Sequence, residues 1–118
     1  MSTHLIAVVE DDVSVLEALE SLLEYAGYHV LLFPSAEELL DSGRLHEIDL
    51  LITDIGLSGI NGIELLRSLR TRRADLPALV ITARGELKQA ALDAGARQVF
   101  LKPLDNSQLL EAIEASLR

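Results

Sequence analysis

Five short, mostly apolar runs alternate along this chain with longer stretches of helical periodicity, and this alternation limits the fold more than any other feature. The apolar runs have the length of β-strands. Strands that are apolar throughout are buried on both faces, which is typical of a parallel sheet covered by helices. The predicted strands are residues 5–9, 28–33, 50–53, 78–82 and 99–101.

The segments between these runs carry apolar residues three and four positions apart, the spacing of an amphipathic helix. Gly27 and Gly95 predict helix ends, Ser35 with Glu38 predicts a capping box for a short helix, and Asp105 or Asn106 is a predicted cap of the last helix. The fourth helix is predicted over 86–94. The predicted buried stripes are Val15, Leu16, Leu19, Leu22, Leu23 and Ala26 in the first helix, Leu65, Leu66 and Leu69 in the third, and Leu109, Leu110, Ile113 and Leu117 in the last.

Short connections and right-handed crossovers leave few topologies for such a chain. We predict an α/β fold with a doubly wound, five-stranded parallel sheet in the order 2-1-3-4-5 and helices on both faces, the flavodoxin-like arrangement. The length of 118 residues suits one domain, so residues 1–118 are predicted to form a single unit. A hydrophobic content of 49% is sufficient for a packed core.

Composition excludes several classes of site and partner. The chain has no cysteine, so disulfides and thiolate metal sites are excluded. The net charge of −9 opposes direct binding to a nucleic-acid backbone. The first residues lack the pattern of a secretory signal, and no apolar run approaches the ~20 residues that span a bilayer, so we expect a cytoplasmic protein that does not bind membranes.

Polar residues follow four of the predicted strands where each one ends. Glu10 and Asp11 follow the first, Asp54 the third, Thr82 ends the fourth, and Lys102 follows the fifth. The carboxyl ends of parallel strands lie at the same edge of the sheet, where ligands bind in doubly wound folds. Each residue alone has an ordinary structural explanation as a cap, a turn residue or a strand end, but the combination predicts a shared site.

Acids, a hydroxyl and a lysine at one edge suit phosphoryl transfer. Neighbouring carboxylates repel one another unless they hold a cation, and Mg²⁺ prefers such oxygen ligands. Asp54, at the end of a central strand, is the predicted nucleophile. Lys102 would offset charge on phosphoryl oxygens, and Thr82 would donate a hydrogen bond to one of them. Because this ammonium faces the edge more than the core, its removal is expected to cost the free protein little stability.

The segments AVVEDD, ITDIGLSGINGIELL, ALVITA and VFLKPL together resemble the response-regulator receiver domains of two-component signalling. The resemblance implies that Asp54 is the phosphoacceptor and that Glu10, Asp11, Asp54 and the Gly56 carbonyl bind Mg²⁺. It also implies that Thr82 and Lys102 are the switch hydroxyl and the phosphoryl-binding lysine, and that the bond before Pro103 is cis.

The same resemblance implies a role in a phosphorelay. A histidine kinase or a histidine phosphotransfer protein would supply the phosphoryl group, and the surface of the fourth helix, fifth strand and last helix would change and pair with a second copy. Self-phosphorylation and autodephosphorylation are the only chemistry expected, so the chain is not predicted to be an enzyme. The alternative is a pseudoreceiver, an interaction module of the same fold that works without phosphorylation.

Two positions depart from the family pattern. Ser58 stands where the family usually has proline, which predicts a more mobile loop after Asp54. Val99 stands where the family has an aromatic ring, and Phe100 is expected to point to the opposite face of the strand. Flavin binding is disfavoured because acids, and not a hydroxyl- and glycine-rich loop, follow the first strand. A phosphohydrolase of the haloacid dehalogenase type is disfavoured because Gly56 stands where its second acid is required.

Overall fold

The computed structural model describes residues 4–57 and 59–118, and Ser58 therefore lies outside the described residues. A five-stranded parallel sheet has the order β2-β1-β3-β4-β5, which confirms the predicted doubly wound, flavodoxin-like topology. The strands are β1 (Leu5–Val9), β2 (His29–Phe33), β3 (Leu50–Asp54), β4 (Ala78–Thr82) and β5 (Gln98–Leu101). The α-helices are α1 (Val13–Tyr25), α2 (Ala36–Asp41), α3 (Gly62–Arg72), α4 (Lys88–Asp93) and α5 (Asn106–Ser116).

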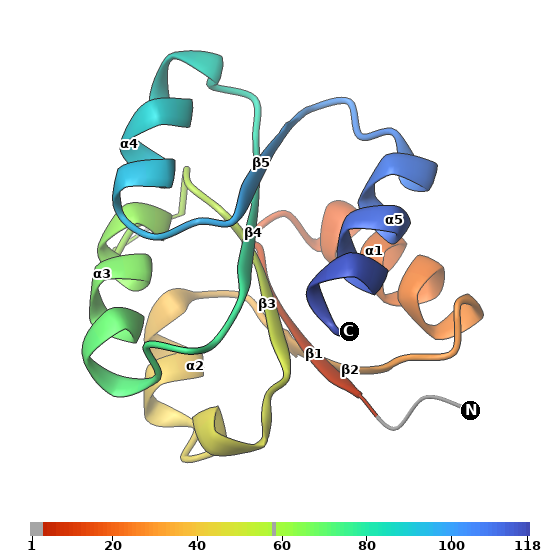
Figure 1. Cartoon of the computed structure of the whole chain (residues 1–118), viewed down its shortest axis with the longest axis horizontal. Coiled ribbons are helices and arrows are strands. Elements are labelled where there is room, and N and C mark those ends of the chain that lie inside the picture. Colours follow the sequence, from red (N-terminus) through yellow and green to blue (C-terminus); the bar gives the residue numbers. More distant parts are fainter. Residues whose placement is uncertain (1–3, 58) are drawn as a thin grey trace.

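The sheet lies between two layers of helices. Helices α1 and α5 cover one face, and α2, α3 and α4 cover the other (Figure 1). Side chains of a strand alternate between these faces. In β1, Ile6 packs into the cluster that contains Leu19 of α1, while Ala7 packs into the cluster that contains Leu66 of α3. Each face thus has its own hydrophobic core, and both cores are needed to bury the strands.

The buried stripes agree with the predicted ones except at their ends. Leu16, Leu19, Leu23, Leu65, Leu66, Leu69, Leu109 and Ile113 are buried, and Val15, Leu22, Leu110 and Leu117 are partly buried. Ala26 is exposed, contrary to prediction, because α1 ends at Tyr25 and Ala26 is its C-cap, one residue beyond the helix. Within the two described stretches of chain, no helix has the length and apolar character needed to cross a membrane.

Side-chain caps mark where most helices begin. The Ser35 hydroxyl accepts the Glu38 N–H as predicted, but a complete reciprocal capping box occurs instead between Asn61 and Glu64 of α3. Asp105, and not Asn106, caps α5. The helix predicted over 86–94 is divided into a 3-10 turn at Gly85–Leu87 and α4, and no side chain caps either part.

Candidate functional site

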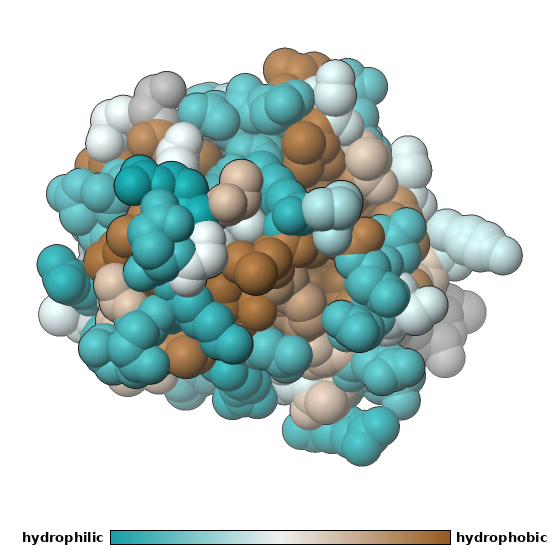
Figure 2. Space-filling model, turned by 90° about the horizontal axis from the view of Figure 1, so that it is seen from above, coloured by the Kyte–Doolittle hydropathy of each residue, from teal (hydrophilic) through white to brown (hydrophobic). Residues whose placement is uncertain are grey.

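The predicted site residues meet at the carboxyl edge of the sheet. Glu10 follows β1, Asp54 and Thr82 end β3 and β4, and Lys102 follows β5. Because β1, β3, β4 and β5 are consecutive in the sheet, these four ends are neighbours. Figure 2 views the molecule from this side and shows hydrophilic residues around a central hydrophobic group.

Burial separates these residues from ordinary surface polar groups. Among the described residues, the buried polar or charged side chains are Glu10, Thr53, Asp54 and Thr82, and the exposed fractions are 1% for Glu10 and 8% for Asp54. An ionised side chain is costly to bury unless it is paired and hydrogen-bonded. These carboxylates therefore require a compensating cation at the edge of the sheet.

Lys102 supplies that cation. Its Nζ lies 2.7 Å from Asp54 Oδ2 and 3.0 Å from Glu10 Oε1, so one ammonium bridges two carboxylates that are 48 and 92 residues away in sequence. The Lys102 side chain is itself 26% exposed. Its charged end contacts the two acids, whereas the charged ends of most long basic side chains stay in water.

Each carboxylate uses its second oxygen to accept a backbone N–H. Gly56 N–H donates to Asp54 Oδ1 at 3.1 Å, and Asp11 N–H donates to Glu10 Oε2 at 3.0 Å. Such bonds favour the ionised carboxylate. Both acids are consequently held in fixed orientations by the loops that follow their strands.

These contacts and burial shift the pKa values of the three charged groups in different directions. Burial alone would raise the pKa of Asp54, but the hydrogen bonds from Lys102 and Gly56 and the charge of Lys102 outweigh it and lower that pKa. Burial, assisted by the charge of Asp54, raises the pKa of Glu10 despite its bond to Lys102. Burial would lower the pKa of Lys102, but the two carboxylates raise it. Asp54 is thus an ionised, oriented carboxylate at neutral pH.

Thr82 is buried beside this group at the end of β4. Its Oγ1 accepts the Arg84 N–H at 2.9 Å, so the hydroxyl keeps its own hydrogen for another acceptor. Lys102 N–H donates to the Thr82 carbonyl at 2.9 Å, which links the two strand ends. The peptide bond between Lys102 and Pro103 is cis, the isomer that the resemblance implies.

The predicted metal ligands lie at the same edge of the sheet, at the ends of β1 and β3, but they are not assembled into a three-acid group. Asp11 is exposed, and Glu10 and Asp54 both face Lys102. In the part of the chain that the structure describes, no three histidine or acidic side chains are arranged to hold a metal ion. Mg²⁺ binding by Glu10, Asp11, Asp54 and Gly56 stays a prediction.

Val99 and Phe100 lie on opposite faces of β5, as the alternation of a strand predicts. Val99 packs with the core under α3 and α4, whereas Phe100 packs with the core under α1 and α5. The position where the family pattern has an aromatic ring is therefore held by Val99, which pairs with Val80 of β4 and packs in the same core.

Sequence reasoning missed two features of this edge. It did not predict that Lys102 would bind Glu10 and Asp54 at once, because no local pattern connects residues so far apart. It also missed Glu37 of α2, whose Oε2 accepts the Ile60 N–H at 3.1 Å in the loop after β3. The sequence signal for the Glu37 contact was the glycine at position 59. Gly59 adopts a φ of +74° and lies directly against the Glu37 carboxylate.

Comparisons with known proteins give the same assignment as the geometry. Residues 6–114 match the response regulator receiver domain family. The chain is 37% identical over 112 residues to the transcriptional regulatory protein FixJ of Azorhizobium caulinodans and 39% identical over 115 residues to the response regulator MprA of Mycobacterium avium. These alignments cover 93% and 96% of this chain but only 53% and 50% of the relatives, so the chain spans about half their length.

A solved structure agrees equally well. The putative response regulator from Chloroflexus aurantiacus superimposes with a TM-score of 0.92 at 33% sequence identity, and the alignment covers 98% of both chains. The family match spans residues 6–114, and the positions of Glu10, Asp54, Thr82 and Lys102 all lie within it. This chain belongs to the response regulator receiver domain family.

Proposed function

We propose that this receiver domain accepts a phosphoryl group on Asp54 from a phosphohistidine of a histidine kinase or a histidine phosphotransfer protein, and passes the signal on by a change in its surface. The observation that carries the proposal is the 2.7 Å contact between Lys102 Nζ and Asp54 Oδ2. This contact supports an Asp54 carboxylate that is ionised and oriented. It also supports a Lys102 ammonium that stays close enough to contact the phosphoryl group once this group is attached to Asp54.

The proposed step is an in-line displacement. An oxygen of Asp54 attacks phosphorus, the O–P bond forms, the N–P bond to the donor imidazole breaks, and that nitrogen keeps the electron pair and later binds a proton from water. The Lys102 ammonium offsets charge on the phosphoryl oxygens, which is the main requirement of such chemistry. Hydrolysis of the resulting acyl phosphate by water restores the carboxylate, and we propose no other catalytic activity.

The donor set fits a Mg²⁺ ion. Glu10, Asp11 and Asp54 offer carboxylate oxygens and Gly56 a backbone carbonyl, and hard oxygen donors of this kind suit Mg²⁺, which needs few protein ligands. Asp54 Oδ1 accepts the Gly56 N–H and Glu10 Oε2 accepts the Asp11 N–H, and a carboxylate has electron pairs beyond these for a cation. When bound, the ion would offset charge on the phosphoryl group together with the Lys102 ammonium.

The partner surfaces we propose are those of the family. Leu101 at the end of edge strand β5 is 53% exposed, which supports pairing of two copies through α4, β5 and α5. We propose that a phosphodonor protein docks at the carboxyl edge, where Val13, the first residue of α1, is 62% exposed and would be available for contact. The net charge of −9 argues that this part of the protein does not itself bind nucleic acid.

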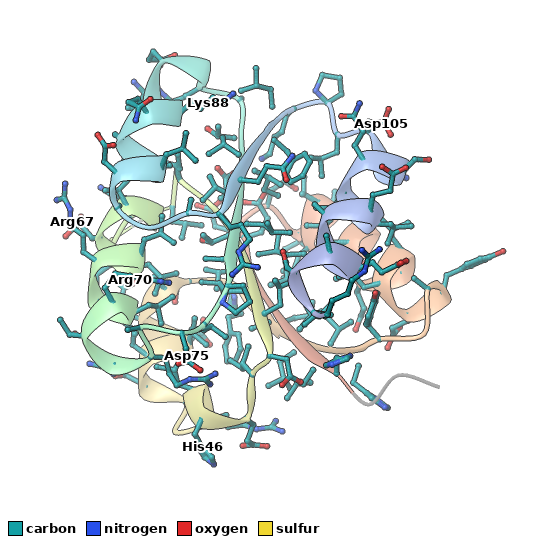
Figure 3. The ribbon with its side chains drawn as sticks, in the orientation of Figure 1. His46, Arg67, Arg70, Asp75, Lys88 and Asp105 are labelled. Carbon is teal, nitrogen blue, oxygen red and sulfur yellow. The ribbon has the colours of Figure 1, made fainter. Side chains whose placement is uncertain are left out.

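The test is intact-mass measurement after incubation with acetyl phosphate and Mg²⁺. We expect one added phosphoryl group, none in Asp54→Asn, and none in excess EDTA. Asp75→Asn is the matched control. Asp75 is an exposed aspartate that lies far from Lys88 and Asp105, which mark the starts of α4 and α5 (Figure 3). An adduct that persists in Asp54→Asn or in EDTA would refute the proposal. A folded domain that forms no adduct would favour the pseudoreceiver alternative.

We also propose that the switch works by displacement and not by a ring rotation. A phosphoryl oxygen would attract the Thr82 hydroxyl, and Val99 has too few rotamers and too little reach to fill the space it leaves. The loop 83–86 and α4 would shift instead. Amide chemical shifts of the beryllofluoride-bound domain should change beyond Ala83, and changes confined to Glu10, Asp11 and the loop after Asp54 would contradict this mechanism.

A further inference from the structure

Glu37 lies outside the charged group of Asp54 but reaches the loop that leaves it. This residue is in the first turn of α2, and its Oε2 accepts the Ile60 N–H at 3.1 Å across 23 residues of sequence. Its second oxygen, Oε1, is buried and accepts no hydrogen bond from the residues that the structure describes. A buried carboxylate oxygen in this condition is costly, so its presence calls for a compensating role.

The loop backbone closes directly on this carboxylate. Gly59 has a φ of +74°, and a Cβ atom at this position would collide with Glu37 Oε2. Only glycine adopts this backbone conformation without strain and also leaves space for the acid. Glu37 and the tip of the loop are therefore fitted to each other.

Local bonds hold the two ends of the same loop. Leu57 N–H and Gly62 N–H both donate to the Ile55 carbonyl, at 2.9 and 3.0 Å, and Gly62 packs so closely on the Asp54 carbonyl that no side chain fits there. The capping box of Asn61 orients the start of α3. Between these ends, Glu37 holds the loop from outside the segment, on the side of α2.

We propose that Glu37 is a positioning residue for phosphorylation: by binding the Ile60 N–H, it fixes the loop that presents the Gly56 backbone beside Asp54. The inference rests on the proposed function, because it assigns this loop a role in holding Mg²⁺ and the phosphoryl group. Gly56 already contacts Asp54 Oδ1 through its N–H, so a displaced loop would move this backbone relative to the carboxylate.

Three substitutions separate the hydrogen bond from the charge. Glu37→Gln keeps an oxygen of the same reach but loses the charge, Glu37→Asp keeps the charge but is one methylene too short, and Glu37→Ala loses both. Asp41→Ala is the matched control, because Asp41 is an exposed acid on the same short helix. Mg²⁺ binding by the unphosphorylated domain is followed by amide chemical shifts, and the rate with acetyl phosphate is measured over a range of Mg²⁺ concentrations. Hydrogen exchange of the Ile60 amide reports the loop itself.

We expect the half-saturating Mg²⁺ concentration to rise roughly tenfold in Glu37→Ala and Glu37→Asp, the usual cost of losing a group that orients metal ligands. Glu37→Gln and Asp41→Ala should stay within about twofold of wild type. The Ile60 amide should exchange faster in Glu37→Ala and Glu37→Asp, and at the wild-type rate in Glu37→Gln and Asp41→Ala. If Mg²⁺ binding weakens in Glu37→Gln but not in Glu37→Asp, the effect is one of charge acting through space, and the inference is overturned. Mg²⁺ binding of wild-type strength in Glu37→Ala would overturn it as well. Failure of the wild-type domain to bind Mg²⁺ would refute the proposed function as well, whereas normal phosphorylation of all variants would refute this inference alone.

Discussion

Removal of the Lys102 ammonium tests the energetics of the site most directly. In Lys102→Met, a side chain of similar length loses its charge, and Glu10 and Asp54 keep their burial without a cation. Two unit charges about 4 Å apart attract by about 4 kcal/mol at an effective dielectric constant near 20. Lys102 Nζ lies closer than this to one oxygen of each carboxylate, at 3.0 Å from Glu10 and 2.7 Å from Asp54. The desolvation of Lys102 opposes much of this gain, and breaking a buried ion pair by removal of one partner costs about 3–5 kcal/mol.

The 26% exposure of Lys102 places the expected loss near the lower limit, about 3 kcal/mol of unfolding free energy at pH 7.5. In a domain of this size such a loss lowers the melting temperature by about 10 °C. From the sequence alone we expected the free protein to lose little stability, because the sequence does not show that the ammonium has two buried partners. With those two contacts known, we expect the larger loss given above.

The loss should depend on pH with a definite sign. In the wild type, Asp54 has a lowered pKa, so its ionised form stabilises the fold above the ordinary pKa of aspartate, and this is lost as pH falls through the folded pKa. Glu10 has a raised pKa, so its ionised form destabilises the fold, and stability is regained as pH falls through its folded pKa. Without Lys102 both carboxyls bind protons more tightly, so the loss in Lys102→Met should shrink to about 1–2 kcal/mol at pH 5.

Urea unfolding followed by circular dichroism at pH 7.5 and pH 5 measures both values. Lys88→Met is the matched control, because Lys88 is the only other lysine in the chain and is exposed at the start of α4 (Figure 3). It should change stability by less than about 0.5 kcal/mol. A loss in Lys102→Met as small as that of the control, or one that does not diminish at pH 5, would refute this account of the site.

Two further substitutions test the supports of the site. Gly62→Ala should lower the unfolding free energy by about 1–3 kcal/mol in urea, because the added Cβ would collide with the Asp54 carbonyl and Ile55 Cα; a stability equal to wild type would show that α3 can move away without cost. Asp12→Ala should cost about 1 kcal/mol, since Asp12 Oδ1 accepts N–H groups of Ser14 and of the following residue at the start of α1. Asp12→Asn, which also caps helices, should retain most of that stability, and a loss equal to that of alanine would count against the capping role.

Much of the site was predictable because its residues lie at or directly after the ends of strands. The apolar runs that end at Val9, Thr53, Thr82 and Leu101 locate four loops at one edge of a parallel sheet, and the polar residues at those points needed no further information to be grouped. The opposite orientations of Val99 and Phe100 followed equally from the period of two residues in a strand.

Helix boundaries were less predictable where local signals are weak. The segment 86–94 has helical spacing, but nothing caps its start, and the chain forms a 3-10 turn before α4 begins at Lys88. Ala26 has the spacing of a buried residue but lies just past the end of α1. Periodicity indicates which face of a helix is apolar, whereas caps and packing decide how far the helix extends.

By itself, the sequence determined the topology, the apolar stripe of each long helix and the four strand ends that form the site, because these follow from periodicity and from the order of the elements along the chain. Only the tertiary structure decided that Lys102 binds Glu10 and Asp54 together, and that Glu37 reaches Ile60 at a loop built around Gly59. Those contacts join segments that are 23 to 92 residues apart, and a hydrogen bond forms or fails over a few tenths of an ångström. Their existence depends on how closely the packed helices and strands bring those side chains together, and no spacing along the chain contains that information.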